Sequence, residues 1–106
     1  MDIIKDIEPE KVWELSQSGA LLLDVRGKLE FMAGVIPGSL TIPHTKVPAN
    51  LAELEAYRDK TIITYCAVGG RSSQVQAFLI DQGFSNVLNG GAYSEIKKVG
   101  KEKGFL

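Results

Sequence analysis

The sequence alternates short apolar runs with segments in which apolar residues recur at helical spacing. Residues 21–25 and 61–65 are nearly continuous runs of apolar and β-branched residues, a pattern typical of strands buried on both faces. Shorter runs at 39–42 and 87–88 predict two further strands. Helices are predicted around these strands, at residues 9–16, 28–33, 51–57, 72–82 and 93–99. The alternation predicts an α/β fold in which a mostly parallel sheet carries helices on both faces.

Three local signals predict where elements begin and end. Asn50 is a good N-cap for the helix at 51–57, because its side chain can accept an amide hydrogen bond and Glu53 stands where a capping box needs it. Ser72 is expected to open the helix that stops before Gly83. The tripeptide at 89–91, Asn-Gly-Gly, is typical of a turn between the last strand and the last helix.

Length and composition indicate one folded domain over residues 1–106. Hydrophobic residues make up 44% of the chain and charged residues 24%, which is the balance of a globular protein. The 12 basic and 13 acidic residues nearly cancel, so a nucleic-acid partner bound through many phosphates is not expected. The longest apolar run near the start, residues 20–23, is far too short to cross a bilayer, so no membrane association is expected.

A single cysteine and a single histidine exclude most metal and disulfide chemistry. Cys66 and His44 cannot by themselves form a closed zinc site, and one cysteine cannot form an internal disulfide. No metal or organic cofactor is therefore expected, and His44 is expected in a solvated loop. A lone thiol and the absence of a signal-peptide pattern at the N-terminus predict a cytoplasmic location.

Candidate chemistry gathers at the end of the strand at 61–65. In parallel sheets, ligands bind beyond the carboxyl ends of the strands, and Cys66 stands at that end. Gly69 and Gly70 allow successive backbone N–H groups to turn inward as an anion-binding nest. The start of the following helix and the guanidinium of Arg71 add positive charge. All of these effects favour the anionic form of the cysteine sulfur.

The size of this effect decides whether the thiol is reactive. A free thiol with a pKa of ~8.5 is only about 3% ionised at neutral pH, whereas helix N-termini and nearby cations lower thiol pKa values to between ~3.5 and ~7.5. A lowering by about two units makes roughly three-quarters of the sulfur anionic. A cysteine after an apolar strand can equally be a small buried hydrophobe. The reactive interpretation therefore requires an ionised Cys66 that reagents can reach, and a thiol sealed in the interior would contradict it.

The motif Cys-x-x-Gly-x-Arg-Ser at 66–72 resembles the active-site loop of the rhodanese-like sulfurtransferases. Further matches to this family run in order along the whole chain. They are Leu23-Asp24-Val25-Arg26, Glu30-Phe31, Gly34-Val35-Ile36-Pro37-Gly38-Ser39, Ile42-Pro43, Gly83-Phe84 and Gly90-Gly91. The resemblance implies a single rhodanese-like domain with a parallel sheet of about five strands.

The resemblance also implies roles for individual residues. Cys66 would be the nucleophile that accepts a sulfane sulfur from a donor such as thiosulfate, a persulfide or a polysulfide. The resulting persulfide would pass its sulfur to cyanide, a thiol or a partner sulfur-carrier protein. Asp24 and Arg26 would support the site by tying the first strand to neighbouring loops. The cradle around the transferred sulfur would consist of Ala67, Val68, Gly69, Gly70, Arg71 and Ser72.

Several functions remain open at this level. The same persulfide could serve a sulfur carrier or docking module with little small-molecule turnover, and an inactive regulatory domain is disfavoured by the intact cysteine. Phosphatases and arsenate reductases of this fold have five residues between the cysteine and the arginine, whereas four separate Cys66 from Arg71, so they come last. Ala67 and Val68 add no cation, which predicts weak turnover of dianionic thiosulfate compared with less charged persulfides or polysulfides. The lysines near the C-terminus are expected to be solvated, with a docking patch for an acidic partner left open.

Overall fold

The computed structural model describes residues 2–106, and a four-stranded parallel sheet forms its centre. The strands are β1 (Leu21–Asp24), β2 (Leu40–Thr41), β3 (Thr61–Cys66) and β4 (Asn86–Ala92), in the order β2-β1-β3-β4. Every neighbouring pair is parallel, so all four carboxyl ends lie at one edge of the sheet. The predicted α/β architecture is confirmed.

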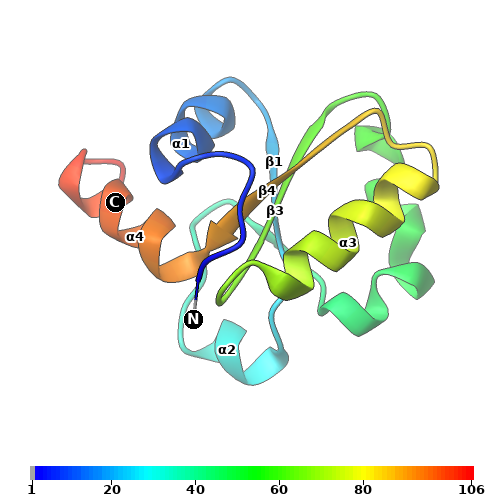
Figure 1. Cartoon of the computed structure of the whole chain (residues 1–106), viewed down its shortest axis with the longest axis horizontal. Coiled ribbons are helices and arrows are strands. Elements are labelled where there is room, and N and C mark those ends of the chain that lie inside the picture. The colour runs from blue at the N-terminus through cyan, green and yellow to red at the C-terminus, as the bar shows by residue number, and fades with distance from the viewer. Residues whose placement is uncertain (1) are drawn as a thin grey trace.

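Helices cover both faces of the sheet (Figure 1). On one face lie α1 (Pro9–Gln17) and α4 (Tyr93–Glu102), which pack against each other, and on the other lies α3 (Gly70–Asp81). Two 3₁₀ segments, η1 (His44–Lys46) and η2 (Pro48–Tyr57), accompany α3. The short helix α2 (Lys28–Met32) lies at the carboxyl edge of the sheet, beside the loop that follows β3.

Alternating side chains of the strands divide the core into two clusters. Leu21 and Leu23 of β1 join the cluster under α3, whereas Leu22 joins the one under α1 and α4. This follows from strand geometry, because successive side chains point to opposite faces. Trp13 and Ile96 close the second cluster, and the indole N–H of Trp13 donates to the Ile96 carbonyl at 2.8 Å. Both strand faces are therefore buried, as the apolar runs predicted.

The sheet has four strands in the described residues, one fewer than the resemblance implied. At the β4 edge, the segment at 4–6 makes two backbone hydrogen bonds, from the Ile4 N–H to the Val68 carbonyl and from the Asp6 N–H to the Asn89 carbonyl, both at 2.8 Å. These two bonds go to two different elements, so the segment forms no regular ladder with β4. It runs alongside the loop after β3 (Figure 1).

The predicted turn at 89–91 is wrong, because β4 continues through it to Ala92. The register between β3 and β4 shifts between Thr64 and Tyr65, and Gly91 has a φ of +87°. A Cβ at Gly90 would lie 2.8 Å from the Ile63 side chain. The glycines therefore permit an irregularity and a close approach within a strand rather than a chain reversal.

Two predicted helix starts also differ from the structure. The segment around Asn50 is 3₁₀ from Pro48, with a kink at Asn50, whose side-chain amide donates backwards to the Lys46 carbonyl at 2.7 Å instead of capping. The helix expected to open at Ser72 begins at Gly70, because Gly69 at a φ of +94° serves as its N-cap. Ser72 is consequently inside the first turn. No helix in residues 2–106 is both long and apolar enough to span a bilayer.

Candidate active site

The loop between β3 and α3 folds around the sulfur of Cys66. Cys66 is the last residue of β3, and the chain turns at Gly69 before α3 begins. The Gly69 N–H donates to the Cys66 Sγ at 3.1 Å, and the Ser72 hydroxyl lies 3.4 Å from the same atom. A positive φ at Gly69, which glycine adopts without a steric penalty, then turns the chain into α3. The anticipated convergence of donors on the sulfur is therefore present.

These donors lower the pKa of the Cys66 thiol. Burial raises the pKa, but hydrogen bonds from the Ser72 hydroxyl and from backbone amides outweigh burial and hold it below its ordinary value. The amides are those of Ser72, Val68 and Gly69. The shift favours the thiolate, the nucleophilic form of cysteine.

Cys66 itself is fully buried, with an exposed fraction of 0%. The sequence-based interpretation requires a thiol that reagents can reach, and this conformation does not meet that requirement. The reason is geometric, since the loop that supplies the hydrogen bonds also covers the sulfur, and the side chain packs into the cluster under α3. Reaction at Cys66 therefore needs a displacement of the loop or of the segments packed on it.

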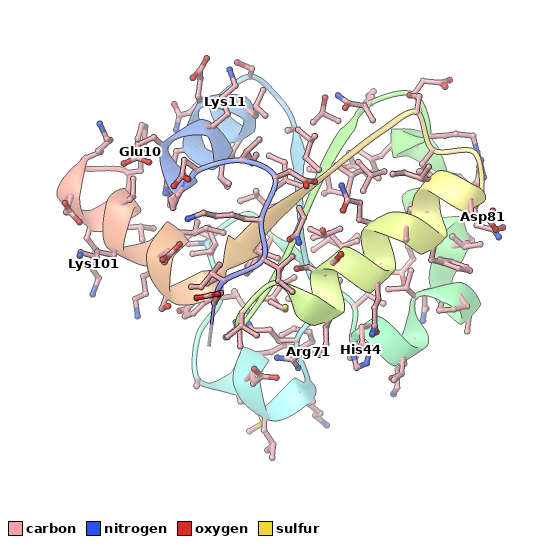
Figure 2. The ribbon with its side chains drawn as sticks, viewed as in Figure 1. Glu10, Lys11, His44, Arg71, Asp81 and Lys101 are labelled. Atoms are coloured by element: carbon pink, nitrogen blue, oxygen red, sulfur yellow. The ribbon has the colours of Figure 1, made fainter. Side chains whose placement is uncertain are left out.

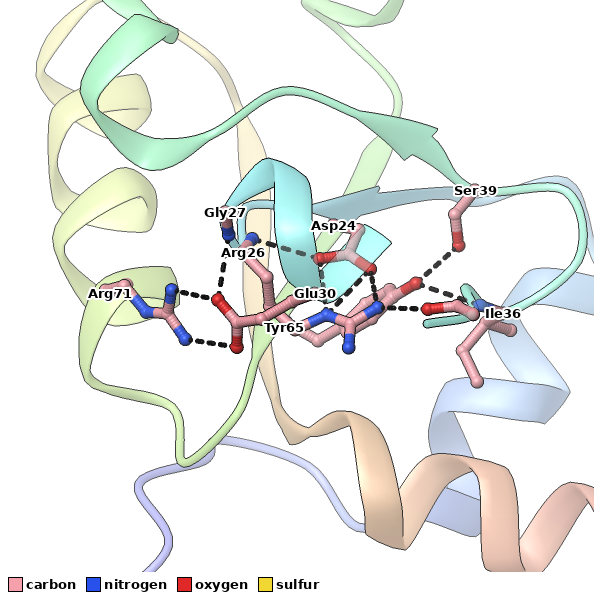
Figure 3. Close-up of polar contacts among 9 residues, drawn as sticks. Asp24, Arg26, Gly27, Glu30, Ile36, Ser39, Tyr65 and Arg71 are labelled. Atoms are coloured by element: carbon pink, nitrogen blue, oxygen red, sulfur yellow. Dashed lines mark hydrogen bonds and ion pairs between the residues drawn. The ribbon is translucent and has the colours of Figure 1, made fainter. Parts of the chain in front are cut away.

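Arg71 is held by an ion pair that joins α3 to α2 (Figure 3). Its Nη1 and Nη2 atoms donate to the two carboxylate oxygens of Glu30, at 2.7 and 3.0 Å. Glu30 also accepts the Gly27 N–H at 2.9 Å. The Arg71 guanidinium lowers the pKa of Glu30 to about 2, so the pair is ionised over the physiological range. Arg71 is thus paired with Glu30 first, and its interaction with the Cys66 sulfur comes second among the groups that raise the Arg71 pKa.

Asp24 and Arg26 form a buried ion pair at the end of β1 (Figure 3). The Arg26 Nη2 donates to Asp24 Oδ2 at 2.8 Å and to the Gly34 carbonyl at 2.6 Å. Its guanidinium carbon also lies 4.0 Å from the centre of the Tyr93 ring. These contacts tie β1 to the loop before β2 and to α4.

Asn89, which the sequence pattern placed in a turn, is buried beside the loop and forms several hydrogen bonds there. Its amide nitrogen donates to the Gly69 and Ile4 carbonyls at 3.0 and 3.2 Å. Its carbonyl oxygen accepts the Gly91 N–H at 3.0 Å and the Ser72 hydroxyl at 2.7 Å. The Ser72 hydroxyl has one hydrogen, which rotation can direct to Asn89 or to the Cys66 sulfur. Asn89 therefore orients two parts of the cradle.

The predicted residues of the loop differ in how far they are buried. Ser72 is fully buried beneath the loop, whereas Ala67 is exposed and Val68 half-buried. Arg71 and His44 lie at the same end of the molecule, whereas Lys101 of α4 lies far from them (Figure 2). No group of three or more His, Cys, Asp or Glu side chains within residues 2–106 is arranged to hold a metal ion.

Two residues, Glu30 and Asn89, were assigned no role at the site from the sequence, although the sequence holds weak signals for them. Glu30 is the only acidic residue in the predicted helical turn at 28–33, so its charge marked it as a partner for a cation. Asn89 is a polar residue next to an apolar strand, a pattern that turns share. Neither signal predicts that Glu30 pairs with Arg71 or that Asn89 bonds Ser72.

Comparison with known proteins agrees with this geometry. Residues 8–98 match the family model of the rhodanese-like domain. A sulfurtransferase of Allochromatium vinosum is 38% identical over 69 residues, which cover 65% of this chain and 63% of that protein, just under two thirds of its length. The thiosulfate sulfurtransferase GlpE of Haemophilus influenzae is 33% identical over 85 residues, or 80% of this chain and 79% of its own. The human single-domain sulfurtransferase TSTD1 has a TM-score of 0.73 and 28% identity, covering 87% of this chain and 94% of its own.

The chain belongs to the rhodanese-like domain family. Sequence relatives and structural neighbours agree on this assignment. The residues that match the family model include the whole loop from Cys66 to Ser72. At the level of the family, these findings support a sulfurtransferase.

Proposed function

We propose that this protein is a sulfurtransferase in which Cys66 takes a sulfane sulfur from thiosulfate, a persulfide or a polysulfide and passes it to a thiophilic acceptor. The observation that carries the proposal is the hydrogen bond of 3.1 Å from the Gly69 amide to the Cys66 sulfur, together with the lowered pKa of this thiol. The relatives named sulfurtransferase support the same reaction class.

The proposed reaction consists of two displacements at sulfur. The Cys66 thiolate attacks the outer sulfur of thiosulfate, its S–S bond to the sulfonate sulfur breaks, and sulfite leaves with the electron pair. The new Cys66 persulfide then gives its terminal sulfur to cyanide or a thiolate, and the Cys66 thiolate is regenerated. Backbone amides at Val68 and Gly69 stabilise negative charge in both anionic forms. The cycle needs no metal and no net oxidant or reductant.

Access to the buried sulfur is part of the proposal. Cys66 has no exposed surface, so the donor reaches it only when its cover moves. The proposed cover is the loop itself together with the Glu30–Arg71 ion pair, whose side chains are about one-third exposed and therefore only weakly held. An opening of this rim leaves the sheet and both core clusters intact.

Mass spectrometry of the intact protein tests the first half-reaction. After incubation with thiosulfate or a polysulfide and removal of excess donor, the protein should carry one additional sulfur, and Cys66→Ser should carry none. Release of thiocyanate on addition of cyanide then tests the second half-reaction. A native protein that neither gains sulfur nor reacts with iodoacetamide at Cys66 would refute the proposal, because its thiol would be permanently sealed.

Two other functions make different predictions in the same experiment. A sulfur carrier or docking module gains the sulfur but turns over cyanide or small thiols poorly, and a protein acceptor discharges it. A phosphatase or arsenate reductase hydrolyses or reduces its oxyanion without storing sulfur. The oxyanion chemistry is disfavoured by Arg71, whose two terminal nitrogens are already bonded to Glu30.

A further inference from the structure

The segment at 4–6, distant in sequence from the cysteine, contacts the peptide that supports the sulfur. The Ile4 N–H donates to the Val68 carbonyl at 2.8 Å. In the same peptide unit, the N–H of Gly69 points the opposite way and donates to the Cys66 Sγ at 3.1 Å. One rigid, planar peptide therefore connects the backbone of Ile4 to the reactive sulfur.

The other side of this contact is also fixed. The Ile4 carbonyl accepts the side-chain amide of Asn89 at 3.2 Å, and Asn89 bonds the Gly69 carbonyl as well. A Cβ on Gly69 would overlap the Ile4 carbonyl, so the segment can lie here only because residue 69 is glycine. Ile4 is held between Asn89 and the loop.

We propose that the backbone of Ile4 is a positioning element for Cys66, because it holds the 68–69 peptide with the Gly69 N–H aimed at the sulfur. Chains of hydrogen bonds polarise one another, so the bond from Ile4 strengthens the Gly69 donor when the sulfur is anionic. The inference deepens the proposed sulfurtransferase function and rests on it for its biological meaning. What it predicts physically is a change in the pKa of Cys66, which can be measured without any sulfur transfer.

A change in the Ile4 backbone removes none of the charged groups around the thiol, so its effect on the thiol can be measured separately from theirs. Arg71 follows in the loop and is paired with Glu30 of α2, and the end of β1 carries the Asp24–Arg26 pair. The N-terminal segment and its neighbours contribute further groups, none of which a change in the Ile4 backbone removes. These groups are Lys5, which pairs with Glu8 and Glu95, Asp6, which accepts the Gln76 side-chain amide and the Asn89 N–H, and His44 of η1 beside α3.

The substitution Ile4→Pro removes this one donor, since proline has no amide hydrogen. Its matched control is Ile4→Ala, which keeps the N–H and loses only a side chain that is 53% exposed. The rate of iodoacetamide alkylation is measured as a function of pH for the three proteins. Ile4→Pro is expected to raise the Cys66 pKa by about one unit, which reduces alkylation about tenfold below the pKa. Ile4→Ala is expected to titrate like the wild type.

An Ile4→Pro profile that coincides with the wild type, or an equal shift in Ile4→Ala, overturns the inference. A second measurement needs no substitution and covers the case in which Ile4→Pro does not fold. In the wild-type protein, the amide proton resonances of Gly69 and Ile4 should both titrate with the Cys66 midpoint, whereas that of Asp6, which bonds Asn89, should not. An Ile4 resonance that ignores the Cys66 titration contradicts the inference. Because neither readout involves a sulfur donor, failure to form a persulfide would refute the proposed function alone.

Discussion

The ion pair between Glu30 and Arg71 gives the most direct test of how α2 is attached to the active-site loop. Glu30→Gln removes one negative charge and keeps the size of the side chain. It breaks a two-point contact, at 2.7 and 3.0 Å, that spans 41 residues of sequence (Figure 3). The variant should therefore loosen α2 from the start of α3 and leave Arg71 without its counter-charge.

The expected loss of stability follows from the pKa of Glu30. Arg71 lowers that pKa from its usual 4.5 to about 2, a difference that corresponds to about 3 kcal/mol for a pair shielded from solvent. The side chains of Glu30 and Arg71 are 36% and 31% exposed, however, so solvent screens the pair and the real contribution is smaller. We expect Glu30→Gln to lower the free energy of unfolding by about 1 kcal/mol at pH 7.

The sign of the pH dependence is fixed by the same values. Because the pKa of Glu30 is lower in the folded state than in the unfolded state, the pair stabilises the fold fully above pH 4.5 and progressively less as pH falls towards about 2. Urea denaturation of wild type and Glu30→Gln at pH 7 and at about pH 3 measures this difference. The gap between the two proteins should narrow at the lower pH.

A second exposed pair supplies the control. Arg58 donates to both carboxylate oxygens of Glu55 on η2, at 3.1 and 2.7 Å, in a geometry similar to the pair at the site. Glu55→Gln should leave the alkylation rate of Cys66 unchanged, whereas Glu30→Gln should increase it because the cover of the sulfur is released. Equal stability of wild type and Glu30→Gln at pH 7, or a gap that stays constant at about pH 3, would refute the reasoning.

Three further outcomes are expected. Ser72→Ala removes a hydroxyl that lowers the Cys66 pKa, so the pH profile of alkylation should move to higher pH, and an unmoved profile would exclude this role. Gly69→Ala forces a Cβ onto the Ile4 carbonyl at a φ of +94°, so thermal unfolding should show a loss of about 2–4 kcal/mol; an unchanged Tm would contradict the packing. Wild type should have a lower kcat/KM for thiosulfate than for a less charged alkyl persulfide, with the gap narrowing in Glu30→Gln; a wild-type preference for thiosulfate would oppose this.

The α/β architecture could be predicted from the sequence because a strand buried on both faces is a continuous run of apolar residues. The runs at 21–25 and 61–65 are apolar on both faces, and only a sheet covered on both sides buries them. The anion-binding loop is also predictable from local sequence, because Cys66, Gly69 and the start of the helix lie within seven consecutive residues. A hydrogen bond from Gly69 to Cys66 spans three residues, so local backbone geometry suffices to predict it.

Local signals failed where one sequence pattern fits two environments. Asn-Gly-Gly at 89–91 is typical of an exposed turn, but here the glycines lie in a buried strand whose neighbours leave no room for a Cβ at Gly90. Asn50 is a residue type that often caps helices, yet its side-chain amide donates to the Lys46 carbonyl instead. At Gly90 the packing of distant segments decides the conformation, whereas at Asn50 a carbonyl four residues earlier takes the side-chain amide.

The residues of the chain by themselves determined the thiol, its glycine-rich loop and its place at the end of a buried strand. Only the tertiary structure decided that Arg71 is paired with Glu30, that Asn89 and Ile4 brace the loop, and that Cys66 is covered. The physical reason is that an apolar strand and a glycine-rich loop leave a pattern in consecutive residues, whereas a charged group or a carbonyl can pair with any suitable partner that packing brings close. Which partner it meets is set by the packing of elements that lie 41 to 85 residues apart.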